Sequence, residues 1–221
     1  MNTIVIAIDG PAGTGKSIVA NLLAEKIKFN YIDSGIYYRA VTYWIIKNKI
    51  KPNEIVRICD FTKNAKIHIK DDKVFLNDTD ITSELRSIDV MNKVSSVSRL
   101  RNLRKIVVQK LREHALMDNI VMDGKDIGTV VFPDAKVKFF ITCDDNTRAA
   151  RRQQEFLDSG QKISRDKLIK EMLKRDELDS TRQEGPLKKA EDAIEIDTTN
   201  MIVEEQVDFI YRKLIAKGIL E

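Results

Sequence analysis

The sequence predicts an α/β fold in which helices flank a central parallel sheet. Two observations carry this prediction: apolar, β-branched runs alternate with segments of helical periodicity, and the first of these runs leads directly into a glycine-rich loop. A third observation, an alternating segment near the middle, predicts an antiparallel insertion. At 221 residues the chain suits one compact α/β unit that carries such an insertion.

The glycine-rich loop spans residues 10–17, which read Gly-Pro-Ala-Gly-Thr-Gly-Lys-Ser and fit G-x-x-x-x-G-K-[ST]. This pattern is the P-loop that holds the phosphates of a nucleoside triphosphate. The apolar run 4–8 predicts a buried strand before it, and apolar residues at helical spacing follow it. The loop therefore opens a helix, where backbone N–H groups and the helix dipole favour an anion. A glycine-rich turn that binds nothing is the disfavoured alternative.

The P-loop pattern also assigns roles to single residues. Its glycines let the backbone approach the phosphates, and Lys16 places a positive charge on the β- and γ-phosphates. The Ser17 hydroxyl is a ligand for Mg²⁺, so we expect ATP and Mg²⁺ as cofactors. The expected ATP-binding residues are Gly10, Pro11, Ala12, Gly13, Thr14, Gly15, Lys16, Ser17 and Ile18.

Further segments complete the predicted sheet and its helices. Strands are expected at 29–33, 119–122, 137–141 and 193–197. Helices are expected from 34, over 96–117, over 146–182 and from about 203. Residues 66–70 and 74–76 predict an exposed antiparallel hairpin around a turn at 71–73. In a parallel sheet, binding sites lie where strands end, here at 10–17, 33–39, 123–126 and after 141.

Two of these strand ends carry residues suited to a second substrate. Ser34 is expected to cap a helix with Arg39 one turn inside it, which predicts a second phosphate site or only a capped helix with an exposed arginine. The segment from Asp123 to Asp126 closes a buried strand. A carboxylate there can bind Mg²⁺ through water or accept a hydrogen bond from a substrate amino group, and a simple turn is the alternative.

Two stretches are rich in basic residues. From Lys93 to Arg112 there are seven basic residues, no acidic one and no stacking aromatic. A nucleic-acid surface is therefore disfavoured, and a substrate-phosphate wall and a solvated helix face stay open. Within 148–182, arginines that close over a triphosphate would stabilise the transferred phosphoryl group and exclude water, and a salt-bridged surface helix is the alternative for most of them. The spacing of two sets of residues predicts that the members of each set lie on one face of a helix. The first set is Arg148, Arg151 and Arg152, and the second is Arg175, Asp176, Asp179 and Arg182.

The composition limits the class of protein. The formal net charge of +4, from 38 basic and 34 acidic residues, suits small anionic substrates and is weak support for nucleic acid. Cys59 and Cys143, expected as buried free thiols, suit a reducing compartment. No apolar stretch approaches the roughly 18 residues of a membrane span. We therefore expect a cytoplasmic protein that binds neither membrane nor nucleic acid.

Together these features resemble a bacterial-type cytidylate kinase (CMP/dCMP kinase), a P-loop nucleoside monophosphate kinase, over essentially the full length. The matching stretches are Ile8–Lys16, Asp33–Arg39, Asp80–Arg86, Asp126–Ala135, Arg175–Asp176 with Asp179 and Arg182, and Pro186–Leu187. The run from Asp126 to Ala135 is very specific to that family. The resemblance implies a P-loop core (1–32, 118–147 and 183–221), an NMP-binding region (33–117, with the hairpin insertion at about 60–90) and a helical lid (148–182).

The resemblance also implies an activity, which is transfer of the γ-phosphoryl group of ATP to CMP or dCMP in pyrimidine salvage by a monomer. Its implied CMP ligands are Ser34, Arg39, Lys125 and Arg182 for the phosphate, Ser95, Arg104 and Asp126 for cytosine, and Arg175 and Asp179 for ribose. Its implied catalytic cations are Lys16, Arg151, Arg152 and Arg182, with Arg151 and Arg152 near the triphosphate.

Two positions depart from the family pattern. Lys125 stands where the family usually has Arg, so phosphate binding lacks a bidentate fork. The family's usual Gln-Arg pair falls on Leu111 and Arg112, so Arg101 rivals Arg104 beside the base. The alternative activities are a small P-loop kinase for UMP, dTMP or shikimate, and a P-loop NTPase that binds nucleic acid through 93–112. The hairpin and the Asp126 run argue against the first alternative, and the missing aromatics argue against the second.

Overall fold

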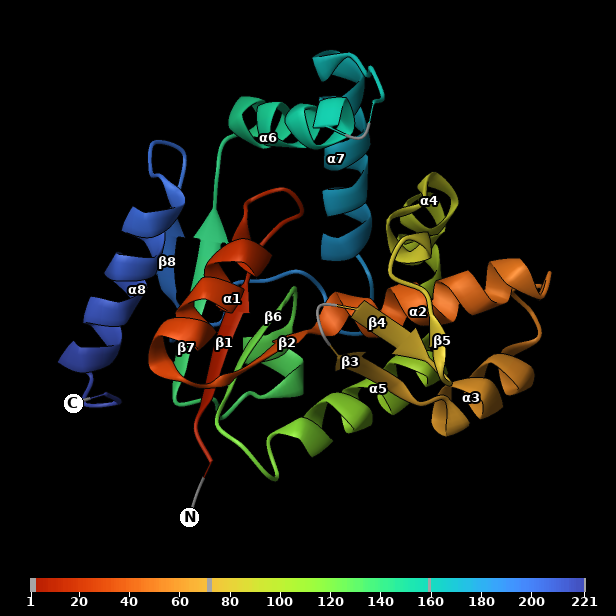
Figure 1. Cartoon of the computed structure of the whole chain (residues 1–221), viewed down its shortest axis with the longest axis horizontal. Helices are drawn as coiled ribbons and strands as arrows, with labels where there is room; N and C mark the ends of the chain where they lie inside the picture. The colour runs from red at the N-terminus through yellow and green to blue at the C-terminus, as the bar shows by residue number, and fades with distance from the viewer. Residues whose placement is uncertain (1–2, 71–72, 159, 221) are drawn as a thin grey trace. The chain divides into compact units, whose positions relative to one another are not determined.

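Figure 1 shows the computed structural model of the chain, which describes residues 3–70, 73–158 and 160–220. The chain forms two compact units: residues 1–32 together with 114–221, and residues 33–113. The second unit is thus an insertion in the sequence of the first. Each unit is described by itself below.

A five-stranded sheet in the order β2-β6-β1-β7-β8 forms the centre of the first unit. The strands are β1 (Val5–Asp9), β2 (Asn30–Asp33), β6 (Ile120–Gly124), β7 (Val137–Thr142) and β8 (Ile194–Asp197). β1 pairs in parallel with β6 and with β7, and β7 pairs in parallel with β8. The predicted parallel sheet is therefore confirmed, with strand positions within two residues of those expected.

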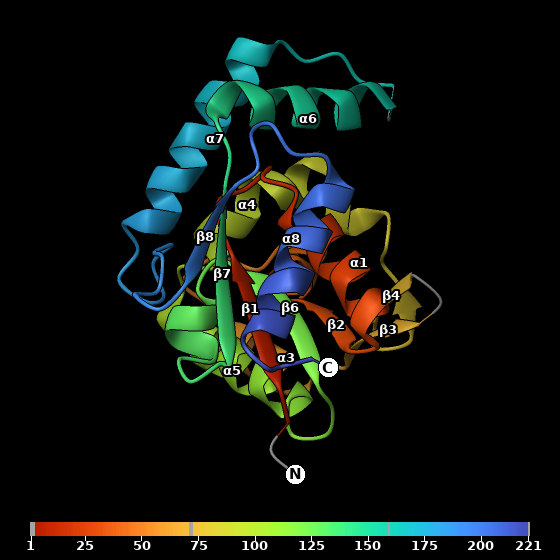
Figure 2. The same cartoon turned by 90° about the vertical axis from the view of Figure 1, so that its left-hand side faces the viewer.

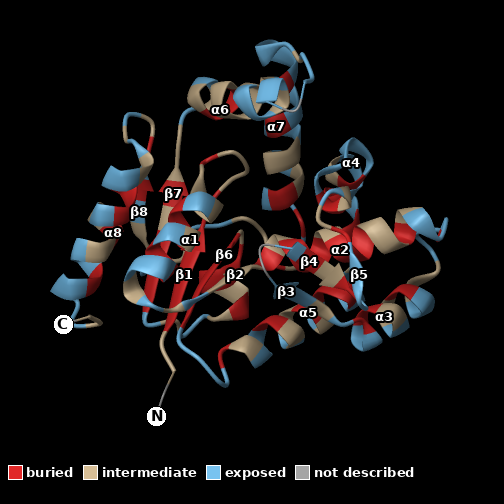
Figure 3. Ribbon diagram, in the orientation of Figure 1, coloured by how far each residue is buried: buried red, intermediate tan, exposed pale blue. Residues whose placement is uncertain are grey.

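Strands β1 and β6 are buried along their whole length and are red throughout in Figure 3. Figure 2 shows α1 (Lys16–Ile27) and α8 (Val203–Ala216) together on one face of the sheet. Leu23 of α1 and Ile210 of α8 join Phe139 of β7 in one apolar cluster. This packing fixes the sheet, and the register places Asp9 at the end of β1 opposite Gly124 of β6. The loops that follow these two strands therefore start side by side.

Two further helices of this unit lie beyond the carboxyl end of β7 (Figure 1). The sequence predicts helix over 146–182, but the structure has α6 (Asp145–Asp158) and α7 (Arg165–Ser180) with a break between them. Gly160, with φ +77°, lies in the break, which explains why one continuous helix does not form. Ala149 of α6 and the α7 residues Leu168 and Met172 make a small apolar cluster that holds the two helices together.

The second unit combines helices with a small antiparallel sheet. Its sheet is β3 (Ile67–Lys70), β4 (Lys73–Leu76) and β5 (Thr79–Asp80), and its helical segments are α2 (Ser34–Lys47), α3 (Ile55–Asn64), η1 (Glu84–Arg86), α4 (Ile88–Val97) and α5 (Arg101–His114). The predicted hairpin is confirmed in β3 and β4. Residues 71 and 72 of its predicted turn lie outside the described residues, and the third strand was not expected.

The helices of this unit differ from expectation in two places. The helix predicted over 96–117 is shorter in the structure: α5 covers Arg101–His114, and residues 96 and 97 belong instead to the end of α4, which was not predicted. Helix α3 was not predicted at all. Its Phe61 stacks on Trp44 of α2, with ring centroids 3.8 Å apart, so tertiary packing also stabilises this helix.

Two composition-based expectations can also be compared with the structure. Cys59 and Cys143 are free thiols, but both are half-buried rather than buried as expected. No helix in the described part of the chain has the length and apolar character that crossing a bilayer requires.

Candidate functional site

The P-loop leaves β1 through a glycine that no other residue can replace. Gly10 has φ +156°, and a Cβ on it would lie 2.3 Å from the carbonyl oxygen of Ile141. Gly15, with φ +88°, is the N-cap of α1, whose first helical residue is Lys16. The loop thus delivers the N-terminal N–H groups of α1 and the Lys16 side chain to one place, as an anion site requires. In the present structure the Lys16 ammonium donates to the carbonyl of Pro11 at 3.1 Å.

The Ser17 hydroxyl faces a carboxylate from the neighbouring strand. Ser17 Oγ donates to Asp123 Oδ2 at 2.7 Å, and the Tyr31 hydroxyl donates to Asp123 Oδ1 at 2.8 Å. Asp123 is only 2% exposed. A P-loop serine beside an aspartate at a strand end is the arrangement that holds Mg²⁺ in P-loop enzymes. The site-residue predictions omitted Asp123, although its position at the end of a buried apolar run was a usable signal.

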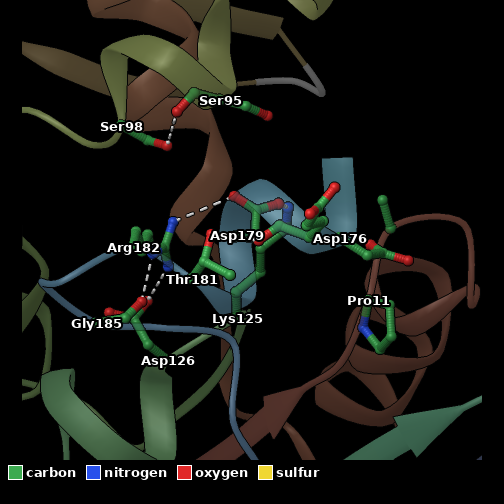
Figure 4. Close-up of polar contacts among 12 residues, drawn as sticks. Pro11, Ser95, Ser98, Lys125, Asp126, Asp176, Asp179, Thr181, Arg182 and Gly185 are labelled. Atoms are coloured by element: carbon green, nitrogen blue, oxygen red, sulfur yellow. Dashed lines mark hydrogen bonds and ion pairs between the residues drawn. The ribbon is translucent and has the colours of Figure 1, made fainter. Parts of the chain in front are cut away.

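A second group of charges follows β6 and the end of α7. Arg182 lies 3.4 Å from Asp179 and 3.5 Å from Asp126, and its Nε donates to the carbonyl of Gly185. Lys125 forms an ion pair with the other oxygen of Asp179. Figure 4 shows Arg182 between Asp179 and Gly185, with Lys125 and Asp126 close by. The structure therefore joins four residues that the sequence assigns to CMP.

Positive charges are crowded in this group. The pKa of Lys125 is lowered to about 7, mainly by burial and also by Arg175, whereas Asp179 partly opposes both effects. The positive charge of Lys16 in the P-loop also lowers that pKa. An anionic ligand bound here would relieve this crowding, because it favours the charged forms of all these cations.

The structure brings together only part of the face predicted for residues 175–182, because α7 ends at Ser180. Asp179 and Arg182 do meet, but Asp176 turns to Arg148 of α6 at 2.5 Å. Arg148 also donates to the carbonyl of Ala12 at 3.2 Å, so it links α6 and α7 to the P-loop.

The other two arginines of α6 have different partners. Arg151 donates to the carbonyl of Thr14 at 3.0 Å and to that of Thr198 at 2.9 Å. Arg152 pairs with Glu155 on its own helix and lies 4.9 Å from the centre of the Phe156 ring. Of the two predicted catalytic cations on this helix, Arg151 therefore contacts the P-loop, whereas Arg152 contacts its own helix.

In the second unit, the segment 33–39 differs from expectation at its cap. Asp33, not Ser34, is the N-cap of α2, and its carboxylate accepts from the Gly35 N–H at 2.8 Å. The expectation failed because Asp and Ser are both good caps and the sequence places them side by side. Arg39 returns to the same carboxylate at 2.7 Å, and Ser34 is buried.

The predicted base-side residues of the second unit lie around the α4–α5 junction. Arg104 is only 3% exposed, donates to the carbonyl of Ser98 at 3.1 Å and lies 5.2 Å from the Tyr38 ring centre. The Ser98 hydroxyl in turn donates to the carbonyl of Ser95 at 3.0 Å. Arg101, the rival of Arg104, is exposed. The structure thus brings Ser95 and Arg104 together through Ser98.

Comparison with known proteins identifies the family. The family model for cytidylate kinase matches residues 6–215 of the 221. The chain belongs to the cytidylate kinase family. A cytidylate kinase of Fusobacterium nucleatum is 42% identical over 214 residues, covering 97% of this chain and 98% of that protein. One from Carboxydothermus hydrogenoformans is 46% identical over 207 residues, covering 91% of this chain and 93% of that protein.

A solved structure gives independent support for the fold. An uncharacterized protein from Eubacterium ventriosum superposes with a TM-score of 0.54 at 16% identity, covering 97% of this chain and 99% of that one. At this identity the likeness concerns the fold alone. The site assignments therefore depend on the geometry described above and on the family.

Proposed function

We propose that this protein transfers the γ-phosphoryl group of ATP to CMP or dCMP, giving CDP or dCDP and ADP. The observation that carries the proposal is the adjacency of two charged sites in one unit. The P-loop follows β1, the Lys125–Asp126 segment follows β6, and Asp9 and Gly124 are opposite each other in the sheet. Membership of the cytidylate kinase family supports cytidylate as the acceptor.

In this proposal the donor binds at residues 10–18, with Lys16 on its terminal phosphates. Arg151, which contacts the P-loop carbonyl of Thr14, is the lid cation best placed to join it. Arg152 would need to leave Glu155 to do so. Ser17 and Asp123 offer Mg²⁺ an alcohol and a carboxylate oxygen, a pair that suits a hard cation completed by phosphate oxygens and water. When bound, Mg²⁺ neutralises charge on the phosphates.

The acceptor's ligands are assigned residue by residue from the family resemblance. Its phosphate is assigned to Lys125 and Arg182 with Ser34 and Arg39, and its ribose to Arg175 and Asp179. Its base is assigned to Asp126 with Ser95 and Arg104, because a carboxylate accepts from the exocyclic amine of cytosine. The buried ion pairs of this group leave side chains preorganised for a charged ligand.

The chemistry needs no general base, since a phosphate oxygen of CMP is already a nucleophile. Lys16, Arg151 and Arg182 would act by positioning the reactants and stabilising the transferred phosphoryl group. Closure of the lid, residues 148–182, would exclude the water that competes with CMP. We also propose that the protein works in the cytoplasm as a monomer without a nucleic-acid partner.

The test is a coupled assay of ADP release with Mg²⁺ and ATP, offering CMP, dCMP, UMP, AMP, dTMP and shikimate separately. We expect turnover with CMP and dCMP that is abolished when Mg²⁺ is chelated. Turnover with another acceptor and not with CMP would contradict the assignment of Asp126, Ser95 and Arg104. ATPase activity stimulated by RNA or DNA, with steep salt dependence, would support the nucleic-acid alternative instead.

A further inference from the structure

Asp9 is a buried carboxylate that none of the roles above uses. It is the last residue of β1, directly before Gly10 of the P-loop, and is 4% exposed. Its Oδ1 accepts from the Ile127 N–H at 2.8 Å and its Oδ2 accepts from the Gly128 N–H at 2.7 Å. Both oxygens are therefore used to hold two consecutive backbone N–H groups of another loop.

That loop begins directly after Asp126 and has an unusual backbone. Residues Ile127–Val131 form η2, a single π-helical turn. The Val130 and Val131 N–H groups both donate to the Asp126 carbonyl, at 2.9 and 3.1 Å. Such turns are rare and occur often at functional sites. Two N–H groups of η2 thus hold the carbonyl of Asp126, and the Asp9 carboxylate holds the first two N–H groups of η2.

We propose that Asp9 is a positioning residue for base recognition, which fixes the Asp126 carboxylate through the Ile127 and Gly128 N–H groups. Because Asp9 is also adjacent to Gly10, the same side chain ties this turn to the start of the P-loop. The inference rests on the proposed function, in which Asp126 accepts from the cytosine amine.

The charged form of Asp9 is the one that this role needs. A protonated carboxyl would turn one oxygen into a donor facing an N–H group. The pKa of Asp9 is raised to about 7: burial raises it most and Asp126 of the turn raises it too, whereas the two N–H groups and Lys16 of α1 lower it. From β7, Lys138 packs its stem beside Gly128 while its ammonium binds Asp192 and the Pro133 carbonyl. Base recognition should therefore weaken as the pH falls through this range.

The main experiment compares kcat/KM for CMP with kcat/KM for UMP in the full-length enzyme and in D9N. Asparagine keeps the shape but points its amide NH₂ at one of the two N–H groups. We expect the CMP-to-UMP ratio to fall about tenfold. The control is I8V, which shortens a fully buried neighbour in β1 and should lower the Tm without changing the ratio. Simple loss of folded enzyme would lower both activities equally and leave the ratio alone.

A D126N variant separates this inference from the proposed function. If D126N lowers the ratio and D9N changes it less than twofold, Asp9 does not position Asp126. If neither variant lowers the ratio, Asp126 does not read the base, and the inference fails together with that part of the proposed function.

A second measurement on the wild-type enzyme decides the matter if D9N does not fold. The CMP-to-UMP ratio should fall as the pH is lowered from 8 to 6, and I8V should show the same dependence. The ionisation of the substrate phosphate is common to CMP and UMP, so it cancels in the ratio. A ratio that is constant over this range would overturn the proposal.

Discussion

Lys125 is the site residue that differs from the family pattern in its chemistry. It is a lysine in contact with Asp179, close to Arg175, in a position where burial works against its charge. An ammonium is a point charge, whereas a guanidinium binds a phosphate or carboxylate with two parallel hydrogen bonds. The family resemblance implies arginine here, so the chain uses the weaker of two suitable groups.

We predict that K125R keeps or raises kcat/KM for CMP, because the guanidinium stays charged and offers a fork to the phosphate. Steady-state kinetics at saturating ATP measure this. K189R is the matched control, since Lys189 forms an exposed ion pair with Glu195 and should tolerate the change without effect. A loss of more than about tenfold, or about 1.4 kcal/mol, in K125R would show that Lys125 has a role that arginine cannot fill.

Single residues also show where sequence reasoning is reliable. The glycine, lysine and serine positions of the P-loop follow from local spacing, because the loop is one continuous segment. Asp123 and Asp126 occur three residues apart, and spacing alone does not say which of them faces Ser17. The strand register decides, because β1 and β6 pair so that Ile8 is opposite Asp123.

At the scale of elements, helix α1 ends in a conformation that does not suit its residue. Lys28 is the C-cap with φ 57° and ψ 40°, the left-handed region that glycine adopts at little cost. The side chain is exposed and its backbone N–H caps the helix. The chain therefore tolerates local strain at the end of a helix that carries the P-loop.

We predict that K28G raises the free energy of unfolding by about 0.5–1 kcal/mol, because the relieved strain of about 1–2 kcal/mol exceeds the extra chain entropy of glycine. Urea unfolding followed by circular dichroism measures the change. E25G, an exposed position in the last turn of the same helix, should instead lower it by about 1 kcal/mol. Equal effects of the two substitutions would contradict the argument.

The existence of elements was easier to predict than their boundaries. The strands were found because buried parallel strands are short, continuous apolar runs. The helices over 96–117 and 146–182 were predicted as continuous because charge and periodicity continue across both breaks. The first break follows the end of α4 at its C-cap Ser98, and the second contains the left-handed Gly160; both are backbone events that periodicity does not report.

For the whole molecule, Asp9 links stability to pH. Its pKa is raised from 3.8 to about 7, mainly by burial, so the folded protein binds a proton there that the unfolded chain has released. The free energy of unfolding should therefore fall as the pH rises from about 4 to about 7, by a few kcal/mol at most, and then level off. The charged form of Asp9 thus costs stability, as is common for residues that serve function.

We predict that D9N removes this part of the pH dependence. Unfolding free energies of wild-type and D9N protein, measured between pH 5 and pH 8, should differ in slope, with the wild type losing more stability as the pH rises. Other titrating groups are common to both proteins, so the difference isolates Asp9. Parallel curves would show that the carboxyl has no raised pKa in the folded state.

The sequence by itself determined the parallel α/β fold, the nucleotide loop and the family, because each depends on residues that are close together in the chain. The tertiary structure alone decided that Asp123 faces Ser17, that Lys125 and Arg182 meet on Asp179, and that Asp9 holds the turn after Asp126. These contacts join segments as far apart as 119 residues. Such contacts depend on strand order and register, which are fixed by the packing of the whole sheet rather than by any local pattern.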